Sequence, residues 1–186
     1  MVDGMDVREY KITDLRDKIG IVPQKAVLFA GTVRSNLAWG KEDATEEEMQ
    51  QALSVAQAAE VVDKKDGKLD AEVEQGGKNF SGGQKQRLTI ARALVKQPEI
   101  LIMDDSSSAL DYATDAKLRQ AIHNMPNRPT VFIVSQRAAS IMYADKIIVL
   151  DDGTVAGTGT HEELLKDCSV YQEIYYSQFK RTEGGH

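Results

Sequence analysis

Short, uninterrupted apolar runs alternate with helical stretches in the second half of the chain. The runs cover residues 100–103, 131–134 and 146–150. A continuous apolar run is typical of a strand that is buried on both faces of a parallel sheet. Between the runs, apolar residues recur at helical spacing over residues 84–96 and about 112–125. This order predicts an α/β fold with a mostly parallel sheet at its core.

Turn and capping residues predict how the chain continues after the third run. Residues 151–153, with the sequence Asp-Asp-Gly, form a tight-turn pattern, so we expect the sheet to end in a hairpin. Thr160 is followed three residues later by Glu163, which is the pattern of a capping box. A last helix should therefore begin at about residue 161.

The middle of the chain has a different composition. Residues 45–66 are rich in Ala, Glu and Gln, which predicts a helical insert rather than part of the sheet. We expect Trp39, just before it, to be a packing residue of this insert. We divide the chain into a helical subdomain at about 45–97 and a sheet core with C-terminal helices at about 1–44 and 98–180. The polar residues 181–186 should form a disordered tail.

Composition excludes several classes of protein. Of the 186 residues, 41% are hydrophobic and 28% charged, as in a globular domain. Lys and Arg number 23 against 29 Asp and Glu, and the net charge of −6 argues against nucleic acid as a partner. No run approaches the roughly 18 apolar residues of a membrane-spanning helix, so a membrane link should come through a partner or a missing segment. A single cysteine, Cys168, excludes an intrachain disulfide.

The strongest local signal is Ser81-Gly82-Gly83-Gln84, directly before a helical stretch. Glycines at a helix start let backbone N–H groups approach an anion closely, and the helix dipole favours negative charge there. The structural alternative is a plain helix cap, with Ser81 as the capping residue and the glycines in a loop.

Two aspartates follow the strand predicted at residues 100–103. A carboxylate at the carboxyl end of a buried parallel strand is where nucleotide-binding sheets hold Mg²⁺ and phosphates. Asp104 would hold Mg²⁺ through water, and Asp105 would lie near an attacking water. The alternative is a solvated turn, with Asp111 or the preceding serines capping the next helix.

Together these residues resemble the ATP-binding-cassette (ABC) ATPases. Residues 81–84 resemble the family signature, residues 100–105 its Walker B strand, and residues 108–111 its D-loop. Gln24 resembles the Q-loop glutamine, and Gln136 falls where the family has its switch histidine. The five motifs occur in the family order over nearly the whole chain.

The resemblance implies that the chain works with ATP and Mg²⁺. It implies Mg²⁺ ligands at Gln24 and Asp104, and catalytic positions at Asp105 and Gln136. The residues that it implies in nucleotide binding are Ser81, Gly82, Gly83, Gln84, Gln24, Ser108 and Asp111. In the family, two cassettes dimerise head to tail, so this signature would close over the nucleotide of a second cassette.

One further segment narrows the resemblance. Residues 28–37, with the sequence Leu-Phe-Ala-Gly-Thr-Val-Arg-Ser-Asn-Leu, resemble the Q-loop continuation of multidrug-type ABC exporters. In those proteins this surface meets the transmembrane domains, and Glu72 and Glu74 lie where exporters carry an acidic loop that also touches them. A solvated loop is the alternative for these two glutamates.

Three departures from the family pattern shape the functional hypothesis. No GxxxxGK followed by Ser or Thr is present, so we expect the chain to lack the Walker A portion and to be inactive alone. Asp105 replaces the catalytic glutamate; its shorter side chain would displace a held water by roughly 1 Å, which can cost about 10²-fold in rate. Gln136 replaces histidine and cannot become cationic as charge develops.

The intact signature and the altered Asp105 and Gln136 together resemble the degenerate-site half of a heterodimeric exporter. The resemblance implies a cytosolic cassette at the cell membrane that drives efflux of drugs or lipids through transmembrane domains. Two alternatives are a regulatory module that holds nucleotide without turnover and a soluble ABC ATPase outside transport. The exporter-like segment and the charge of −6 argue against the second.

Overall fold

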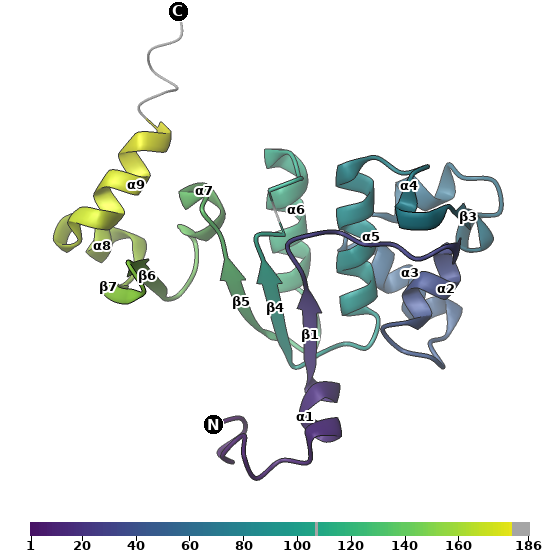
Figure 1. The fold of residues 1–186 in the computed structure, drawn as a ribbon, viewed down its shortest axis with the longest axis horizontal. Helices are drawn as coiled ribbons and strands as arrows, with labels where there is room; N and C mark the ends of the chain where they lie inside the picture. The colour runs from purple at the N-terminus through teal and green to yellow at the C-terminus, as the bar shows by residue number, and fades with distance from the viewer. Residues whose placement is uncertain (107, 180–186) are drawn as a thin grey trace, which may run out of the picture. The chain divides into compact units, whose positions relative to one another are not determined.

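A computed structural model describes residues 1–106 and 108–179 of the protein (Figure 1). The chain divides into two compact units, Met1–Val134 and Ser135–His186.

The first unit is built on a three-stranded parallel sheet. Strands β1 (Ile19–Val22), β4 (Ile100–Asp104) and β5 (Thr130–Val134) lie side by side in the order β1-β4-β5. Parallel pairing aligns Val22 with Met103, and Asp104 with Val134. The α/β fold with a parallel sheet core is therefore confirmed, and the strands predicted at 100–103 and 131–134 are part of it.

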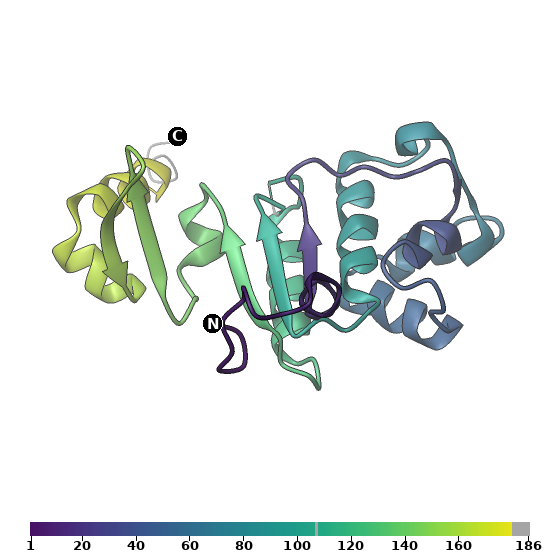
Figure 2. The same ribbon diagram turned by 60° about the horizontal axis from the view of Figure 1, so that its bottom comes forward.

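Two helices pack their apolar faces against this sheet, α5 (Gly82–Leu94) and α6 (Tyr112–His123). One face of the sheet and these two helices share a single hydrophobic cluster. The sheet contributes Val22, Leu101 and Met103, and the helices contribute Leu88, Ile90, Leu94, Leu118 and Ile122. At Gly20 a Cβ atom would lie 2.9 Å from the Ala93 carbonyl oxygen, so glycine is what lets β1 approach α5. Figure 2 shows both helices beside the strands.

The other face of the sheet is open among the described residues. Ile21 is 60% exposed and Phe132 is 57% exposed. The expectation that these strands are covered on both faces is therefore wrong for the described chain. Successive side chains of a strand point to opposite faces, and α5 and α6 cover the face of Val22, not that of Ile21.

Residues 45–66, in the segment between β1 and α5, are mostly helical, as predicted. The segment contains β2 (Gly31–Thr32), α2 (Val33–Ala38), α3 (Glu46–Val55), α4 (Ala59–Asp63), η1 (Lys68–Asp70), β3 (Glu72–Val73) and η2 (Gln75–Gly77), while α1 (Ile12–Lys18) precedes β1. Strands β2 and β3 form a short antiparallel pair. Figures 1 and 2 show this group on the side of α5 away from the sheet. The helix α3 begins with a capping box between Thr45 and Glu48.

In its described part, residues 135–179, the second unit contains a hairpin and three helices. Strands β6 (Ile147–Asp151) and β7 (Thr154–Gly159) pair antiparallel across the predicted turn, and the helices are α7 (Ala138–Ile141), α8 (His161–Asp167) and α9 (Ser169–Phe179). The hairpin is confirmed, but its strands form a separate two-stranded sheet, so the third apolar run does not extend the parallel sheet. The Thr160–Glu163 capping box is confirmed at the start of α8. The predicted tail at 181–186 lies outside the described residues.

Candidate functional site

The signature, residues 81–84, forms the capped start of α5. The Ser81 hydroxyl accepts a hydrogen bond from the Gln84 N–H at 3.3 Å, and the Gln84 Oε1 atom accepts one from the Ser81 N–H at 3.0 Å. These reciprocal bonds form a capping box and satisfy two helix-end donors. The capping alternative is confirmed for Ser81. The glycines, however, form the first turn of the helix rather than a loop.

The two signature glycines differ in what surrounds them. Apart from its chain neighbours and the nearby backbone of α5, no described atom lies within 4 Å of the position that a Cβ atom on Gly82 would take, whereas a Cβ atom on Gly83 would lie 3.2 Å from the Ala109 carbonyl oxygen. Glycine costs a helix about 1 kcal/mol relative to alanine. The chain's own packing explains no such cost at Gly82, and the open space beside it is suited to a ligand that approaches the backbone.

The ends of two strands place Gln24 and Asp104 at one edge of the sheet. Asp104 is the last residue of β4, and Gln24 follows β1 by two residues. Because β1 and β4 are parallel and paired up to Val22 and Met103, both side chains lie at the carboxyl-terminal edge. Both are exposed. This edge is where open α/β sheets bind ligands.

Asp105 starts a turn with an unusual backbone conformation. Its φ of 41° lies in the left-handed region, which costs most residues with a side chain about 1 kcal/mol or more. The Asp105 N–H donates to the Val134 carbonyl at 2.8 Å. The Asp105 carbonyl accepts from the Ser108 hydroxyl at 2.9 Å and from the Ser108 N–H at 3.3 Å. The predicted catalytic position is thus tied to β5 and to the start of the predicted D-loop.

Asp111 ends this turn and caps α6. Its carboxylate accepts hydrogen bonds from the Thr114 N–H at 2.9 Å and from the Thr114 hydroxyl at 2.8 Å. Both bonds lower the pKa of Asp111 below its ordinary value of 3.8, and the bond from the Thr114 N–H has the larger effect. The capping alternative is confirmed for Asp111. The contact of Gly83 with Ala109 places the predicted D-loop beside the signature.

Gln136 belongs to the second unit, whereas the other predicted site residues belong to the first. Its side chain is exposed, and its carbonyl accepts a hydrogen bond from Gln178 Nε2 at 2.7 Å. The Oε1 atom of Gln178 accepts from the Ala138 N–H at 2.9 Å. Helix α9 therefore holds the main chain on both sides of Arg137 through one amide side chain.

The described residues offer oxygen donors for Mg²⁺ but no complete metal site. No group of three or more His, Cys, Asp or Glu residues gathers in residues 1–106 and 108–179 in a way that could hold a metal. Mg²⁺ is usually bound through one or two protein oxygens together with substrate phosphates. Asp104 and Gln24 supply such oxygens at one sheet edge, so they fit a metal ion that arrives with a nucleotide.

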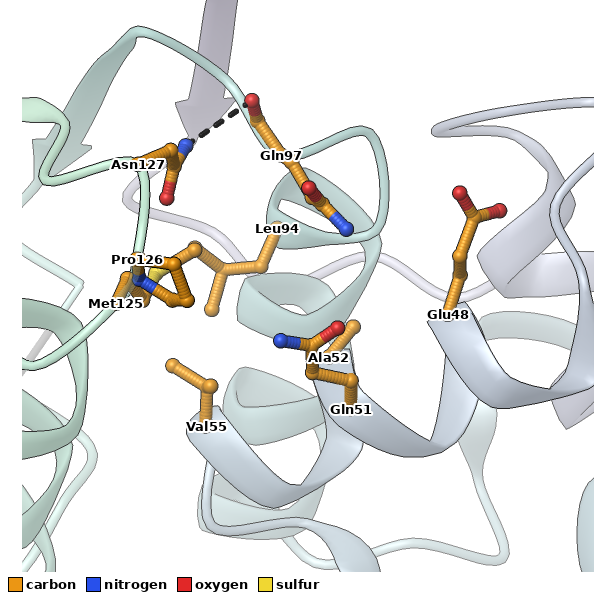
Figure 3. A pocket seen from close by; sticks show the side chains of 9 residues that line it. All are labelled: Glu48, Gln51, Ala52, Val55, Leu94, Gln97, Met125, Pro126 and Asn127. Carbon is orange, nitrogen blue, oxygen red and sulfur yellow. Dashed lines mark hydrogen bonds between the residues drawn. The ribbon is translucent and has the colours of Figure 1, made fainter.

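A small cavity between α3, α5 and the loop after α6 is not a ligand site. Figure 3 shows its lining, which includes Val55, Leu94 and Asn127. Its volume of ≈ 30 Å³ leaves room for only a few water molecules.

The exporter-like segment presents an aromatic surface. Phe29 and Trp39 pack with ring centroids 4.9 Å apart, and Trp39 is 70% exposed, so the expectation that Trp39 packs inside the helical insert is wrong. The Arg92 guanidinium lies 5.5 Å from the centroid of the Phe29 ring, and its Nη2 donates to the Val27 carbonyl at 2.9 Å. We call Phe29, Trp39 and Arg92 the aromatic surface. Glu72 and Glu74 are also exposed.

Asn36, which sequence reasoning missed, fixes this segment. Its side chain is 3% exposed, accepts from the Phe29 N–H at 2.9 Å, and donates to the carbonyls of Phe29 at 2.8 Å and Thr32 at 2.9 Å. A polar residue on the otherwise apolar face of α2 was the available signal, because a buried amide needs such partners.

A parallel sheet with an acidic strand end, beside a glycine-containing capped helix start, is typical of nucleotide-binding α/β domains. The comparisons with known proteins define the class further. The family model for the ABC transporter matches residues 1–108. The chain therefore belongs to the ABC transporter family and corresponds to its ATP-binding domain.

Curated relatives agree with this assignment. An uncharacterized ABC transporter ATP-binding protein of Mycobacterium tuberculosis is 48% identical over 189 residues, which cover 100% of this chain and 32% of the relative. A beta-(1-->2)glucan export ATP-binding/permease protein, NdvA, of Rhodopseudomonas palustris is 43% identical and covers 96% of this chain and 30% of its own length. The chain thus spans about a third of the length of these relatives.

A solved structure shows the same fold. It is the structure of a bacterial Atm1-family ABC exporter with ATP bound, which matches with a TM-score of 0.90 and 36% identity over 96% of this chain and 32% of that one. Within the part of this chain that the structure describes, no helix is both long and apolar enough to cross a membrane.

Proposed function

We propose that this chain is the ATP-binding cassette of a heterodimeric ABC exporter that uses ATP to drive efflux of drugs or lipids. Its signature would complete the hydrolytic site of a second cassette. Its own residues at the end of β4, Asp104 and Asp105, would line a degenerate site. Two findings support this proposal. The curated relatives are named as ABC transporter or export proteins, and the similar solved structure is an exporter with ATP bound. The name of NdvA makes beta-(1-->2)glucan an alternative solute.

The observation that carries the proposal is the open, capped helix start at residues 81–84. Ser81 and Gln84 are held in a capping box, and nothing described crowds the backbone at Gly82. Helix-start N–H groups and the helix dipole stabilise phosphate oxygens. A nucleotide on a partner cassette is the ligand that we assign to this position.

The residue types at two predicted catalytic positions, Asp105 and Gln136, support a degenerate site. Asp105 has a shorter side chain than glutamate. Its own backbone is in the left-handed region at the start of a turn, so the turn and not the strand orients its carboxylate. Gln136 donates hydrogen bonds without gaining charge, and so stabilises developing negative charge less than a histidine that becomes cationic. Asp104 and Gln24 would hold Mg²⁺, which when bound neutralises phosphate charge.

The aromatic surface is the feature from which we infer the partner domains of this chain. Exposed Phe29 and Trp39 form an apolar contact area of the kind that protein interfaces use as anchors. We assign it to the transmembrane domains, which would place the chain on the cytoplasmic face of the cell membrane. With a net charge of −6, nucleic acid is not among the proposed partners.

The test compares signature and strand-end variants in the full-length transporter assembled with its partner. Ser81→Ala should lower ATP turnover by about 10²-fold, the usual cost of losing one transition-state donor. Gly82→Ala keeps its backbone N–H and should lower turnover to a similar extent, because the added methyl group would occupy the open space through which a ligand approaches the backbone. Asp105→Asn should lower it by less than about threefold, since substitution in a degenerate site removes little catalysis. Asn tolerates the left-handed φ of position 105, so this variant removes charge without adding strain.

Equal losses in the two sets would reject the asymmetry. Loss of turnover in neither set would reject a role for this chain in hydrolysis. The isolated 186 residues, which contain no GxxxxGK followed by Ser or Thr, are expected to show no ATPase activity and only weak ATP binding. Micromolar ATP binding in a calorimetric titration would contradict that expectation.

A further inference from the structure

The signature has its own capping box, and the residues just before it in the chain are also held in place by hydrogen bonds. Asn79 lies two residues before Ser81 and is half-buried. Its Nδ2 donates to the Glu72 carbonyl at 2.8 Å, and its Oδ1 accepts from the Glu74 N–H at 3.1 Å. The Asn79 side chain therefore connects the residues just before the signature to strand β3 and to Glu74, the residue after it.

A second anchor acts on the main chain of the same residue. Lys65, which follows α4, donates from Nζ to the Asn79 carbonyl at 3.0 Å. The same Nζ lies 4.5 Å from the centroid of the buried Phe80 ring, at cation–π distance. Residues 79 and 80 are thus held by two elements, β3 and the segment after α4, that lie outside the signature in sequence.

Strand β3 is itself fixed. Its Glu72 and Val73 pair with Thr32 and Gly31 of β2, and Val73 is buried. The buried side chain of Asn36 donates to the carbonyl of Thr32. A continuous set of hydrogen bonds therefore leads from Asn36 through the β2–β3 pair to Asn79, and it begins at the segment that carries Phe29.

We propose that Asn79 is a positioning residue for the signature: its side chain fixes the main chain ahead of Ser81 on β3, so that the helix start is held ready for the partner's nucleotide. Asn79 would not touch the nucleotide. Through β2, the same bonds tie the signature to the aromatic surface. The catalytic part of this inference rests on the proposed function, whereas the positioning part concerns the chain alone.

The first experiment measures amide hydrogen exchange in the 186-residue chain. The N–H groups of Phe80, Ser81 and Gln84 all donate hydrogen bonds and so report on the opening of this region. Asn79→Ala should raise their exchange rates about tenfold, because two hydrogen bonds that hold the segment are lost. Exchange in the β4–β5 ladder should stay unchanged, which a general loss of stability would not allow.

Asn127 provides the matched control. Its Nδ2 also clamps backbone, donating to the carbonyls of Gln97 at 3.2 Å and Pro98 at 2.9 Å, and Figure 3 shows the first of these bonds. Asn127→Ala should leave exchange at residues 80–84 unchanged. If Asn79→Ala does not fold, Lys65→Met, which removes the bond to the Asn79 carbonyl, is measured against the same criterion.

Unchanged exchange at residues 80–84 in the folded variant would overturn the proposal. An equal rise in the β4–β5 ladder, or in Asn127→Ala, would also overturn it, because the effect would then be general.

A second experiment uses the assembled full-length transporter. Asn79→Ala should lower kcat for ATP about tenfold with KM unchanged, as expected for an interaction that matters in the transition state. Asn127→Ala should stay within about twofold of the parent protein. Faster exchange without loss of kcat would overturn the catalytic part. If Ser81→Ala leaves turnover unchanged, the proposed function fails, while the exchange result still decides the positioning of residues 79–84.

Discussion

The two regions predicted to face phosphate are held in different ways. The signature lies at the start of a thirteen-residue helix, α5, and its hydrogen-bond partners are three residues apart. The strand-end region depends on Val134, which is far along the chain, and contains a left-handed residue, Asp105. The capping box of the signature is therefore made by local contacts at the start of a well-packed helix, whereas the geometry at Asp105 depends on the neighbouring strand.

The largest expected effect concerns the contact that fixes α5. A Cβ atom on Gly40 would lie 2.0 Å from the Arg92 carbonyl oxygen and 2.7 Å from a methyl group of Val95. We expect Gly40→Ala to lower the free energy of unfolding by about 3 kcal/mol, because backbone must shift to relieve the overlap. Urea unfolding of the chain measures this loss.

Gly82→Ala, in the first turn of the helix that Gly40 contacts, is the matched control. Apart from its chain neighbours and the nearby backbone of α5, no described atom lies within 4 Å of the added methyl group, and alanine favours helix by up to about 1 kcal/mol. The stability of the chain should therefore stay equal or rise, although turnover of the assembled transporter should fall. A loss as large as that of Gly40→Ala would show that the signature glycine serves packing rather than ligand approach.

A smaller effect distinguishes the strand-end residues. Asp105→Ala should lower the free energy of unfolding by about 1 kcal/mol, because alanine tolerates a left-handed φ less well than aspartate. Asp104→Ala, on the exposed end of β4, should change it by less than about 0.5 kcal/mol. Thermal unfolding of both variants tests the difference, and equal values would remove the argument that position 105 is strained.

The smallest expected effect is a pH dependence at Asp111. Its folded-state pKa is lowered by hydrogen bonds from Thr114, so the carboxylate stabilises the folded state fully above its ordinary pKa of 3.8. This stabilisation is lost as pH falls through the lower, folded-state pKa. Asn at this position caps a helix without titrating. The stability of the parent chain relative to Asp111→Asn should therefore decrease between about pH 5 and pH 2.

Unfolding curves of the two proteins at each pH measure that difference, since all other carboxylates titrate alike in both. A constant difference, or one that grows in acid, would contradict a role for the ionised carboxylate as a helix cap.

Most of the secondary structure could be predicted from the sequence because it depends on near neighbours. The strands at 100–103 and 131–134, the 151–153 turn and the Thr160–Glu163 capping box all follow from residues a few positions apart. The exposure of Trp39 could not be predicted, because an aromatic residue beside a helical segment can face either side. Asn79 could not be predicted either, since its partners are Glu72 of β3 and Glu74 just after it, and β3 is placed by its pairing with the distant β2.

The sequence by itself determined the family, the order of the predicted motifs and the residue types at the two predicted catalytic positions, Asp105 and Gln136. These depend on residue type and spacing, which the chain carries before it folds. Only the tertiary structure decided that one face of the sheet is covered, that β6 pairs with β7 apart from the parallel sheet, and that Gly83 meets Ala109. The physical reason is that burial, strand pairing and close contacts depend on which distant segments pack together.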